Sequence, residues 1–302
     1  MRLIFIFVLM ILSVTSRASE LVVPERSLLL AYEVARSQHT SQSFPFTISS
    51  TEQGNLLAAH VLMKIPVSYA DFRKHLSKHR LWCEFLILHL NIKSCITERQ
   101  QGQYILILFA GRKHYQPPEI TYRLEYRFQL IDNRDGYFEV VMDAPKGPLS
   151  TTNYRIHVQA IPYQNETVMA LGLNYTQSFI SRAATYSYLN TLGRNKVGFS
   201  LDSSTTADAP VYVAGVKGVI ERNVMRYFLA LVSYLQAEKH VEPDSFRRLL
   251  IDWYQATEQY HRQLYEYEEE TYVQAKQKEY LNQRKLQLDI DKKEAKKRRV
   301  AG

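Results

Sequence analysis

Two histidines, one glutamate and a set of tyrosines have the types and spacings in this 302-residue sequence that could do chemistry. His75 and His79 are four residues apart, which can present two metal ligands on one face of a helix. No carboxylate lies at a matching spacing, and Lys74 and Lys78 flank the pair. The pattern therefore favours a solvated basic helix face, and we expect neither a metal site nor a cofactor.

The sequence lacks the signatures of the common enzyme classes. It has no G-x-S-x-G nucleophile elbow, no H-E-x-x-H zinc motif, no Walker loop and no dinucleotide fingerprint. An enzyme needs at least two converging titratable groups, and only Glu221 can be nominated here. We therefore expect a binding protein, and a cyclase- or hydrolase-like enzyme is the alternative.

The segment 218–237 is expected to form a helix with an unusually wide apolar face. On a helical wheel this face spans about 200°, against about 100° for an ordinary surface helix, and Arg222 and Arg226 lie on the back. A helix this apolar needs a concave partner, which a curved sheet supplies. The helix residues expected to contact a ligand between the two are Val224, Met225 and Phe228.

Glu221 falls inside that apolar face. A carboxylate there could orient the polar end of a ligand or pair with an arginine of the sheet. The alternative is a structural carboxylate in the first helical turn, where the helix dipole stabilises a negative charge.

Alternation of apolar and polar residues at 121–131 predicts a strand with one buried and one solvated face. The apolar face carries Tyr122, Tyr126 and Phe128, and a similar strand at 153–161 adds Tyr154. These side chains either line a cavity or form plain core. Further strands are expected at 55–65, 93–99, 104–112, 137–143 and 167–176, and the short turns indicate an antiparallel sheet.

Helices precede, interrupt and follow these strands. We expect them at 24–38, 68–78 and 178–192, with another apolar segment at 81–90. The polar stretch 39–54 is expected to be a loop, and 193–215, with three glycines, a loop or lid near the pocket mouth. One strand, two helices, six strands and a long helix predict an α+β fold.

This order resembles the helix-grip fold of the START-like lipid-binding superfamily, which includes the birch pollen allergens and aromatic polyketide cyclases. The segments DAPKGPLSTTNYRI (143–156), YLNTLGRNKVGFS (188–200) and GVIERNVMRYFLAL (218–231) are similar to blocks of exported bacterial START-like proteins without assigned function. The resemblance covers residues 55–237. It implies a curved antiparallel sheet of about seven strands closed by the long helix, with a lipid or another elongated apolar ligand between them.

The first residues have the pattern of a secretory leader. A basic start, an apolar run at 3–14 and a small-residue cleavage site ending at Ala18 predict that residues 1–18 are removed on export, most simply to a periplasm. Much of the net charge of +8 lies in this leader and in the last twelve residues. The remaining body is almost neutral, so we expect no nucleic-acid partner.

Cys83 and Cys95 are the only two cysteines. An exported protein folds in an oxidising compartment, so the pair predicts one disulfide, with two buried thiols as the alternative. Their spacing is not that of a redox or zinc motif.

We therefore divide the chain into the leader, an N-terminal helix and loop at 19–54, a START-like domain at 55–237 and a helical extension at 238–302. In the extension, an apolar seam at 246–267 is expected to pack on the domain or on a second copy. The seam ends near residue 270, so we expect the rest to be dispensable for folding. An interaction module that uses this helix is a third possible function. Anionic lipid could be contacted by Lys292, Lys293, Lys296, Lys297, Arg298 and Arg299.

Overall fold

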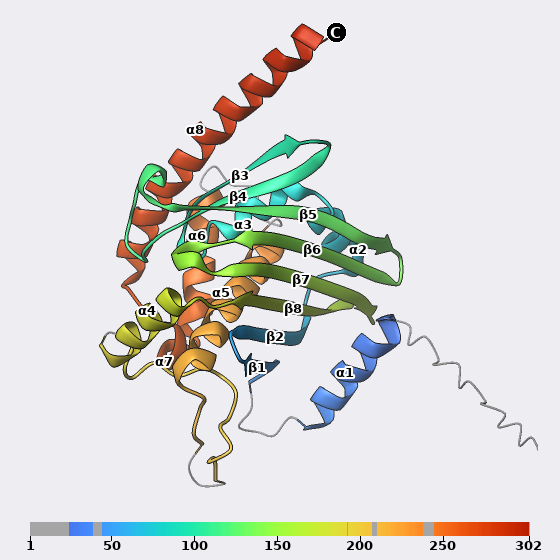
Figure 1. The fold of residues 1–302 in the computed structure, drawn as a ribbon. Helices are drawn as coiled ribbons and strands as arrows, with labels where there is room; N and C mark the ends of the chain where they lie inside the picture. The colour runs from blue at the N-terminus through green and yellow to red at the C-terminus, as the bar shows by residue number, and fades with distance from the viewer. Residues whose placement is uncertain (1–23, 39–43, 192, 207–209, 238–244, 302) are drawn as a thin grey trace, which may run out of the picture.

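The computed structural model describes residues 24–38, 44–191, 193–206, 210–237 and 245–301 (Figure 1). An eight-stranded antiparallel sheet curves around the long helix α5 (Gly215–Ala237). The predicted helix-grip fold is confirmed, with one strand more than expected. The leader assigned to residues 1–18 lies outside the described residues.

The strand order is β1-β2-β8-β7-β6-β5-β4-β3. The chain makes a first hairpin, crosses to the far edge at β3, and returns strand by strand until β8 pairs with β2. The strands are β1 (Thr47–Gln53), β2 (Leu56–Ile65), β3 (Ile92–Gln100), β4 (Gln103–Ala110), β5 (Tyr122–Arg134), β6 (Tyr137–Lys146), β7 (Thr152–Tyr163) and β8 (Glu166–Thr176).

The additional strand is β1, which lies inside the stretch 39–54 that we expected to be a loop. Its sequence, TISSTEQ, is polar and largely exposed, so apolar periodicity does not reveal it. It forms because β2 is an apolar strand whose free edge pairs with it from Thr47 to Gln53. The expectation of an unstructured 39–54 segment is therefore wrong for its second half.

Helices cover both faces of the sheet (Figure 1). The concave face holds α2 (Tyr69–Leu76), α3 (His79–Leu86), α5 and α6 (Ser245–Glu258), whereas α1 (Pro24–Gln38) packs on the outer face of β7 and β8. The remaining helices are α4 (Phe179–Asn190), α7 (His261–Leu264) and α8 (Glu269–Ala301), with short 3-10 turns at Pro118–Ile120 and Pro148–Ser150.

Alternation along the strands determines which residues enter the core. On β6, Phe138, Val140 and Met142 point to the concave side, and their neighbours point outward. The inner side chains join α5 in one large hydrophobic cluster that extends into α6 and the start of α8. Burial of this apolar surface is the dominant favourable contribution to folding.

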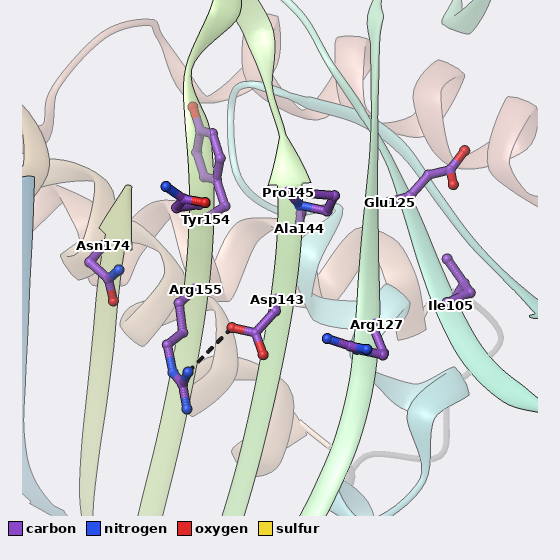
Figure 2. Close-up of a pocket in the computed structure, with 10 residues that line it drawn as sticks. Ile105, Glu125, Arg127, Asp143, Ala144, Pro145, Tyr154, Arg155 and Asn174 are labelled. Atoms are coloured by element: carbon purple, nitrogen blue, oxygen red, sulfur yellow. Dashed lines mark ion pairs between the residues drawn. The ribbon is translucent and has the colours of Figure 1, made fainter. Parts of the chain in front are cut away.

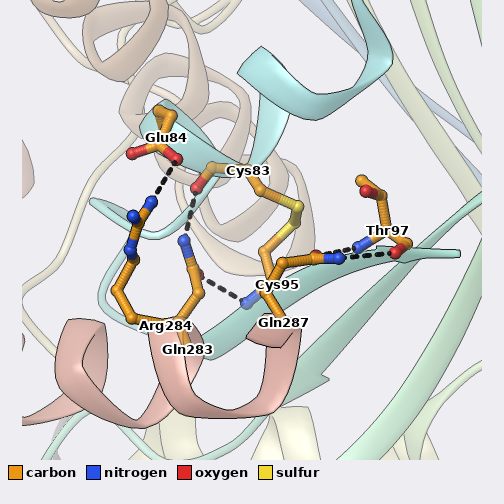
Figure 3. The surroundings of a disulfide bond; sticks show 7 residues. All are labelled: Cys83, Glu84, Cys95, Thr97, Gln283, Arg284 and Gln287. Atoms are coloured by element: carbon orange, nitrogen blue, oxygen red, sulfur yellow. Dashed lines mark hydrogen bonds and ion pairs between the residues drawn. A yellow bond between two sulfur atoms is a disulfide. The ribbon is translucent and has the colours of Figure 1, made fainter. Parts of the chain in front are cut away.

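Cys83 and Cys95 form the predicted disulfide, which joins α3 to β3 (Figure 3). Gln283 of α8 lies over this bond and contacts both cysteine backbones. Its side-chain oxygen accepts a hydrogen bond from the Cys95 amide at 2.7 Å, and its amide group donates to the Cys83 carbonyl at 3.3 Å.

Helix α8 protects the edge of the sheet at β3, and it is not a detached extension. One turn beyond Gln283, Gln287 accepts a hydrogen bond from the Thr97 amide at 2.7 Å and donates one to the Thr97 carbonyl at 3.0 Å (Figure 3). Glu294 accepts a hydrogen bond from the Arg99 amide at 3.0 Å. The unpaired backbone groups of an edge strand are thus satisfied by side chains spaced along a helix.

A buried ion-pair network lies beneath the first turns of α8. Glu279 lies 2.9 Å from the Lys93 ammonium and 2.7 Å from the Lys276 ammonium, and all three side chains are almost completely buried. The expectation that packing ends near residue 270 is therefore wrong. The charged residues after 270 look solvated in the sequence, but several of them are paired inside the protein.

The interpretation of His75 and His79 as a solvated face is also wrong. His75 is buried and its Nδ1 lies 2.7 Å from the Asp71 carbonyl, whereas His79 stacks on Tyr104 with ring centroids 3.7 Å apart. Among the described residues, no group of three or more histidine, cysteine, aspartate or glutamate side chains is arranged to hold a metal ion. None of the described helices is both long and apolar enough to cross a membrane.

Candidate ligand-binding site

Four tyrosines from different elements meet on the concave side of the sheet. They are Tyr126 of β5, Tyr154 of β7, Tyr175 of β8 and Tyr227 of α5, and we call them the tyrosine cluster. The rings of Tyr154 and Tyr175 stack with centroids 4.9 Å apart, and those of Tyr126 and Tyr154 meet edge to face at 6.5 Å. Tyr227 raises the pKa of Tyr126, and Tyr154 raises that of Tyr227, after burial as the main cause in both cases.

The hydroxyl groups of this cluster are largely without protein partners. The hydroxyl of Tyr154 lies 2.8 Å from the Thr151 hydroxyl, with which it shares a hydrogen bond. Within the described residues, no hydrogen bond is made by the hydroxyls of Tyr126, Tyr175 or Tyr227. Burial raises the pKa of all four hydroxyls. They are therefore neutral hydrogen-bond donors at physiological pH.

His89 extends this cluster on the helix side. Its ring stacks on Tyr227 with centroids 4.2 Å apart, and its Nδ1 accepts a hydrogen bond from the Asn91 amide at 3.1 Å. Burial, and next the positive charge of Arg226, hold the pKa of His89 well below its usual value. The neutral ring therefore carries its proton on Nε2, and that buried nitrogen has no partner among the described residues.

The three candidate residues on α5 lie in the densest part of the core. Val224, Met225 and Phe228 have no solvent-accessible area, so no water-sized space adjoins them in the described structure. Protein side chains therefore pack closely around all three, and their contact with a ligand stays a prediction. The wide apolar arc of α5 is explained by packing against the sheet on one side and α6 on another.

The aromatic face of β5 divides into a buried centre and exposed ends. Tyr126 and Phe128 are buried in the main core, whereas Tyr122 is half exposed at the start of the strand. Tyr122 therefore does not contribute to the tyrosine cluster. Sequence reasoning missed Tyr175, Tyr227 and His89, although Tyr175 ends a predicted strand and Tyr227 flanks the apolar face of the predicted helix.

Glu221 binds the chain just before α5 and Ser50 of the edge strand β1, and not an arginine of the sheet. Its carboxylate is fully buried and accepts hydrogen bonds from the Phe199 amide at 2.7 Å, the Ser200 amide at 2.9 Å and the hydroxyls of Ser50 and Ser200. It sits in the second turn of α5, so the first-turn dipole interpretation does not apply. All of these partners are protein groups, which makes Glu221 an anchor for the 198–200 segment.

The segment 193–215, expected to be a loop or a lid, is held closely against α5. A Cβ on Gly198 would lie 2.5 Å from the Glu221 carboxylate and 3.1 Å from the Gly218 Cα, so only glycine allows this approach. An isolated bridge pairs Leu201 with Tyr212. The described part of the segment is therefore anchored at its start.

A groove of about 590 Å³ lies over the strands at the same end of the sheet (Figure 2). Six of the side chains that line it are polar, and on the outer face Arg155 lies 3.5 Å from Asp143 and next to Asn174. Ala144, Pro145 and Tyr154 also line it, so the groove reaches the tyrosine cluster. Glu125 and Arg127 continue this charged surface on β5. The outer-face part of the groove is therefore charged, whereas the part beside Ala144 and Tyr154 is apolar.

No family model matches the chain, and no curated protein matches it significantly. Among solved structures, the chain is similar to Ara h 8.0201 at 10% identity and a TM-score of 0.36, covering 60% of this chain and 99% of that one. It is also similar to norcoclaurine synthase from Thalictrum flavum, in complex with dopamine and hydroxybenzaldehyde. The identity is 13% and the TM-score 0.37, and the match covers 68% of this chain and 97% of that one.

A further similar structure is a STAR-related lipid transfer protein fragment from Xanthomonas axonopodis, at 8% identity and a TM-score of 0.31, covering 50% of this chain and 96% of that one. Structural similarity at such low sequence identities and TM-scores supports no inference about the activity of this chain. The helix-grip fold of this chain rests on its own strand order and on the helix that the sheet encloses.

Proposed function

We propose that this chain is an exported protein that binds a lipid or another predominantly apolar molecule on the concave side of the sheet, against the tyrosine cluster. The observation that carries the proposal is the gathering of three tyrosine hydroxyls that have no partner among the described residues, on rings that lie in or against the main core. A tyrosine hydroxyl in largely apolar surroundings normally finds a hydrogen-bond partner. A polar group of a ligand, surrounded by aromatic rings, would satisfy them together.

Space for that ligand is supported by the groove, which reaches Ala144 and Tyr154 beside the cluster. Strand β6 runs between β5 and β7, and its residue opposite Tyr154 is Ala144. The rings of Tyr126 and Tyr154 approach each other across this alanine. An apolar molecule here would be held mainly by burial of its surface and oriented by the hydroxyls.

Export is part of the proposal, and its support is the leader pattern at residues 1–18 together with the disulfide. The periplasm is the compartment that we propose. Peripheral contact with an anionic membrane is proposed for the basic end of α8, where Lys292, Lys293, Lys296, Lys297 and Arg299 are exposed.

The two faces of β6 allow a direct test with the neutral apolar probe N-phenyl-1-naphthylamine. Ala144→Leu adds bulk beside the tyrosine cluster, and Asp143→Leu, one residue away, places a leucine on the outer face of the same groove. We expect the parent protein to bind the probe at micromolar concentration, Ala144→Leu to weaken binding by at least about tenfold, and Asp143→Leu to leave it unchanged. Thermal unfolding of each variant separates lost binding from lost folding.

Overpacking a core position costs about 1–3 kcal/mol, so Ala144→Val is the smaller substitution if leucine prevents folding. Absence of probe binding to the parent protein, or a loss of binding in Asp143→Leu alone, contradicts a site on the concave face.

A further inference from the structure

The back of α5 carries two arginines that the helical wheel places away from the core, yet both are buried. Arg222 and Arg226 are each 2% exposed. They are covered by the connection after β4, which contributes Lys113, and by the segment after α4, which contributes Lys196. We call these four side chains the basic cluster.

One carboxylate forms ion pairs with this cluster. Glu266, between α7 and α8, lies 2.8 Å from the Arg226 guanidinium and 2.6 Å from the Lys113 ammonium. Burial alone would raise the pKa of Glu266, but Arg226 and Lys113 outweigh burial and lower it. Among the described carboxylates, Glu266 is the one that acts on all four members of the cluster.

The other contacts of the cluster are with uncharged groups. Arg222 donates to the Val197 carbonyl at 3.1 Å, Arg226 to the Leu264 carbonyl at 3.2 Å, and Lys196 to the Tyr265 carbonyl. Lys113 lies 3.4 Å from the Tyr188 hydroxyl. Four cations therefore share one negative charge in a largely buried volume, and uncompensated buried charge is costly.

Hydrogen-bond donors in this region also lack acceptors. The Nε of Arg226 is buried without a partner among the described residues, and so is the Nε2 of His89. Arg226 and His89 are close enough for the arginine charge to lower the histidine pKa. Donors without acceptors, beside an excess of positive charge, are complementary to an oxyanion, which has acceptors only.

We propose that the basic cluster binds an oxyanion, a carboxylate or a phosphate, with Lys113 and Lys196 at its solvent side and Arg226 at its base. The charges of the cluster support this site by themselves. His89 stacks on Tyr227 and lies close enough to Arg226 to be affected by its charge, so it adjoins both the tyrosine cluster and the basic cluster. We therefore assign the oxyanion to the head group of the apolar ligand, and this assignment rests on the proposed function.

The ionisation of Lys113 should influence anion affinity. Burial, and next the charge of Arg226, lower its pKa to about 8. The groups that face it are Arg222 and Arg226 of α5, Lys196 and Tyr188 near α4, His89 after α3, and Glu266 before α8. The ammonium is charged at pH 7 and is largely lost by pH 9, so affinity should fall across that range.

Isothermal titration calorimetry of the mature, disulfide-bonded protein can compare three compounds: inorganic phosphate, dodecyl phosphate below its micelle concentration, and uncharged dodecanol. We expect dodecyl phosphate to bind at least about tenfold more tightly than either of the others. Lys113→Met and Lys196→Met should each weaken dodecyl phosphate by about tenfold, the usual effect of one charge-assisted hydrogen bond. Lys217→Met, at an exposed lysine of α5, should leave the affinity for dodecyl phosphate unchanged.

The outcomes separate the two proposals. If inorganic phosphate binds as tightly as dodecyl phosphate and responds to the same variants, the oxyanion site stands and the head-group assignment is overturned. If neither anion binds, or if Lys113→Met and Lys196→Met both leave affinity unchanged, the oxyanion site is overturned. Binding of N-phenyl-1-naphthylamine is measured in parallel, and its presence or absence decides the proposed function independently.

Discussion

The buried carboxylate of Glu221 lies 2.7 Å from the backbone nitrogen of Phe199, so a residue in the second turn of α5 fixes the chain that leads into that helix. The same carboxylate accepts hydrogen bonds from Ser200 and Ser50. It therefore joins β1, the 198–200 segment and α5 at one point. The geometry identifies Glu221 as a structural residue, because its bonds are with protein groups.

Glu221→Ala should destabilise the protein by about 3 kcal/mol, because it leaves buried amides and hydroxyls without an acceptor. Chemical denaturation measures this change, and limited proteolysis should cut faster in residues 199–206. A variant with unchanged stability that no longer binds N-phenyl-1-naphthylamine would instead return Glu221 to the role of a ligand contact.

Truncation after Glu270 should yield insoluble or unfolded protein. It removes Glu279, the carboxylate partner of Lys93, and exposes the backbone amides of Cys95 and Thr97 on an edge strand. Truncation after Glu294 is the matched control, because it retains these contacts, and should leave the melting temperature within a few degrees. Soluble, cooperatively unfolding protein from the shorter chain would show that α8 is dispensable.

Replacing both cysteines in Cys83→Ala/Cys95→Ala should lower the unfolding free energy by roughly 3 kcal/mol, the chain-entropy value for a short loop. Thiol titration of the unfolded, unreduced parent should detect no free thiol. Two free thiols per chain would contradict the disulfide, and an unchanged melting temperature would contradict its contribution to stability.

Stability should increase with pH between about 8 and 9.5. Burial lowers the pKa of both Lys113 and Lys276 to about 8, so in this range the unfolded chain binds more protons than the folded one. Deprotonation then favours the folded state, by up to about 1.4 kcal/mol per pH unit for each lysine. Above about pH 10 the buried tyrosines reverse the trend, since their raised pKa favours proton loss from the unfolded chain.

Lys276→Met should reduce this slope, whereas Lys278→Met, at an exposed lysine of the same helix, should preserve it. The measurement is the urea midpoint at several pH values. A flat or falling profile in the parent protein would show that the buried lysines keep an ordinary pKa.

Local patterns predicted the elements that bury one face. The alternation around Tyr126 gave the strand β5 and its buried side, and the apolar arc containing Phe228 gave α5 as the gripped helix. Sequence periodicity reports burial of apolar side chains, and these two elements are held mainly by such burial. The disulfide was predicted from an even cysteine count together with the leader pattern at residues 1–18.

Features held by polar contacts were not predicted. Gln283, Gln287 and Glu279 look like solvated helix residues, and only the three-dimensional fold brings them to the edge of β3. Arg222 and Arg226 lie on the polar side of α5, and their burial depends on the separate segments that carry Lys113 and Lys196. The meeting of Tyr126, Tyr154, Tyr175 and Tyr227 depends on the strand order and helix position, which a single sequence does not specify.

The most direct test of the central claim is native mass spectrometry of the mature protein purified from the envelope of its own source, beside the Ala144→Leu variant. The account predicts a bound species on the parent chain that organic solvent releases as an acidic molecule with an apolar part. Ala144→Leu should carry much less of it. A parent protein that repeatedly shows only the mass of the disulfide-bonded chain, and binds no N-phenyl-1-naphthylamine, would contradict the account.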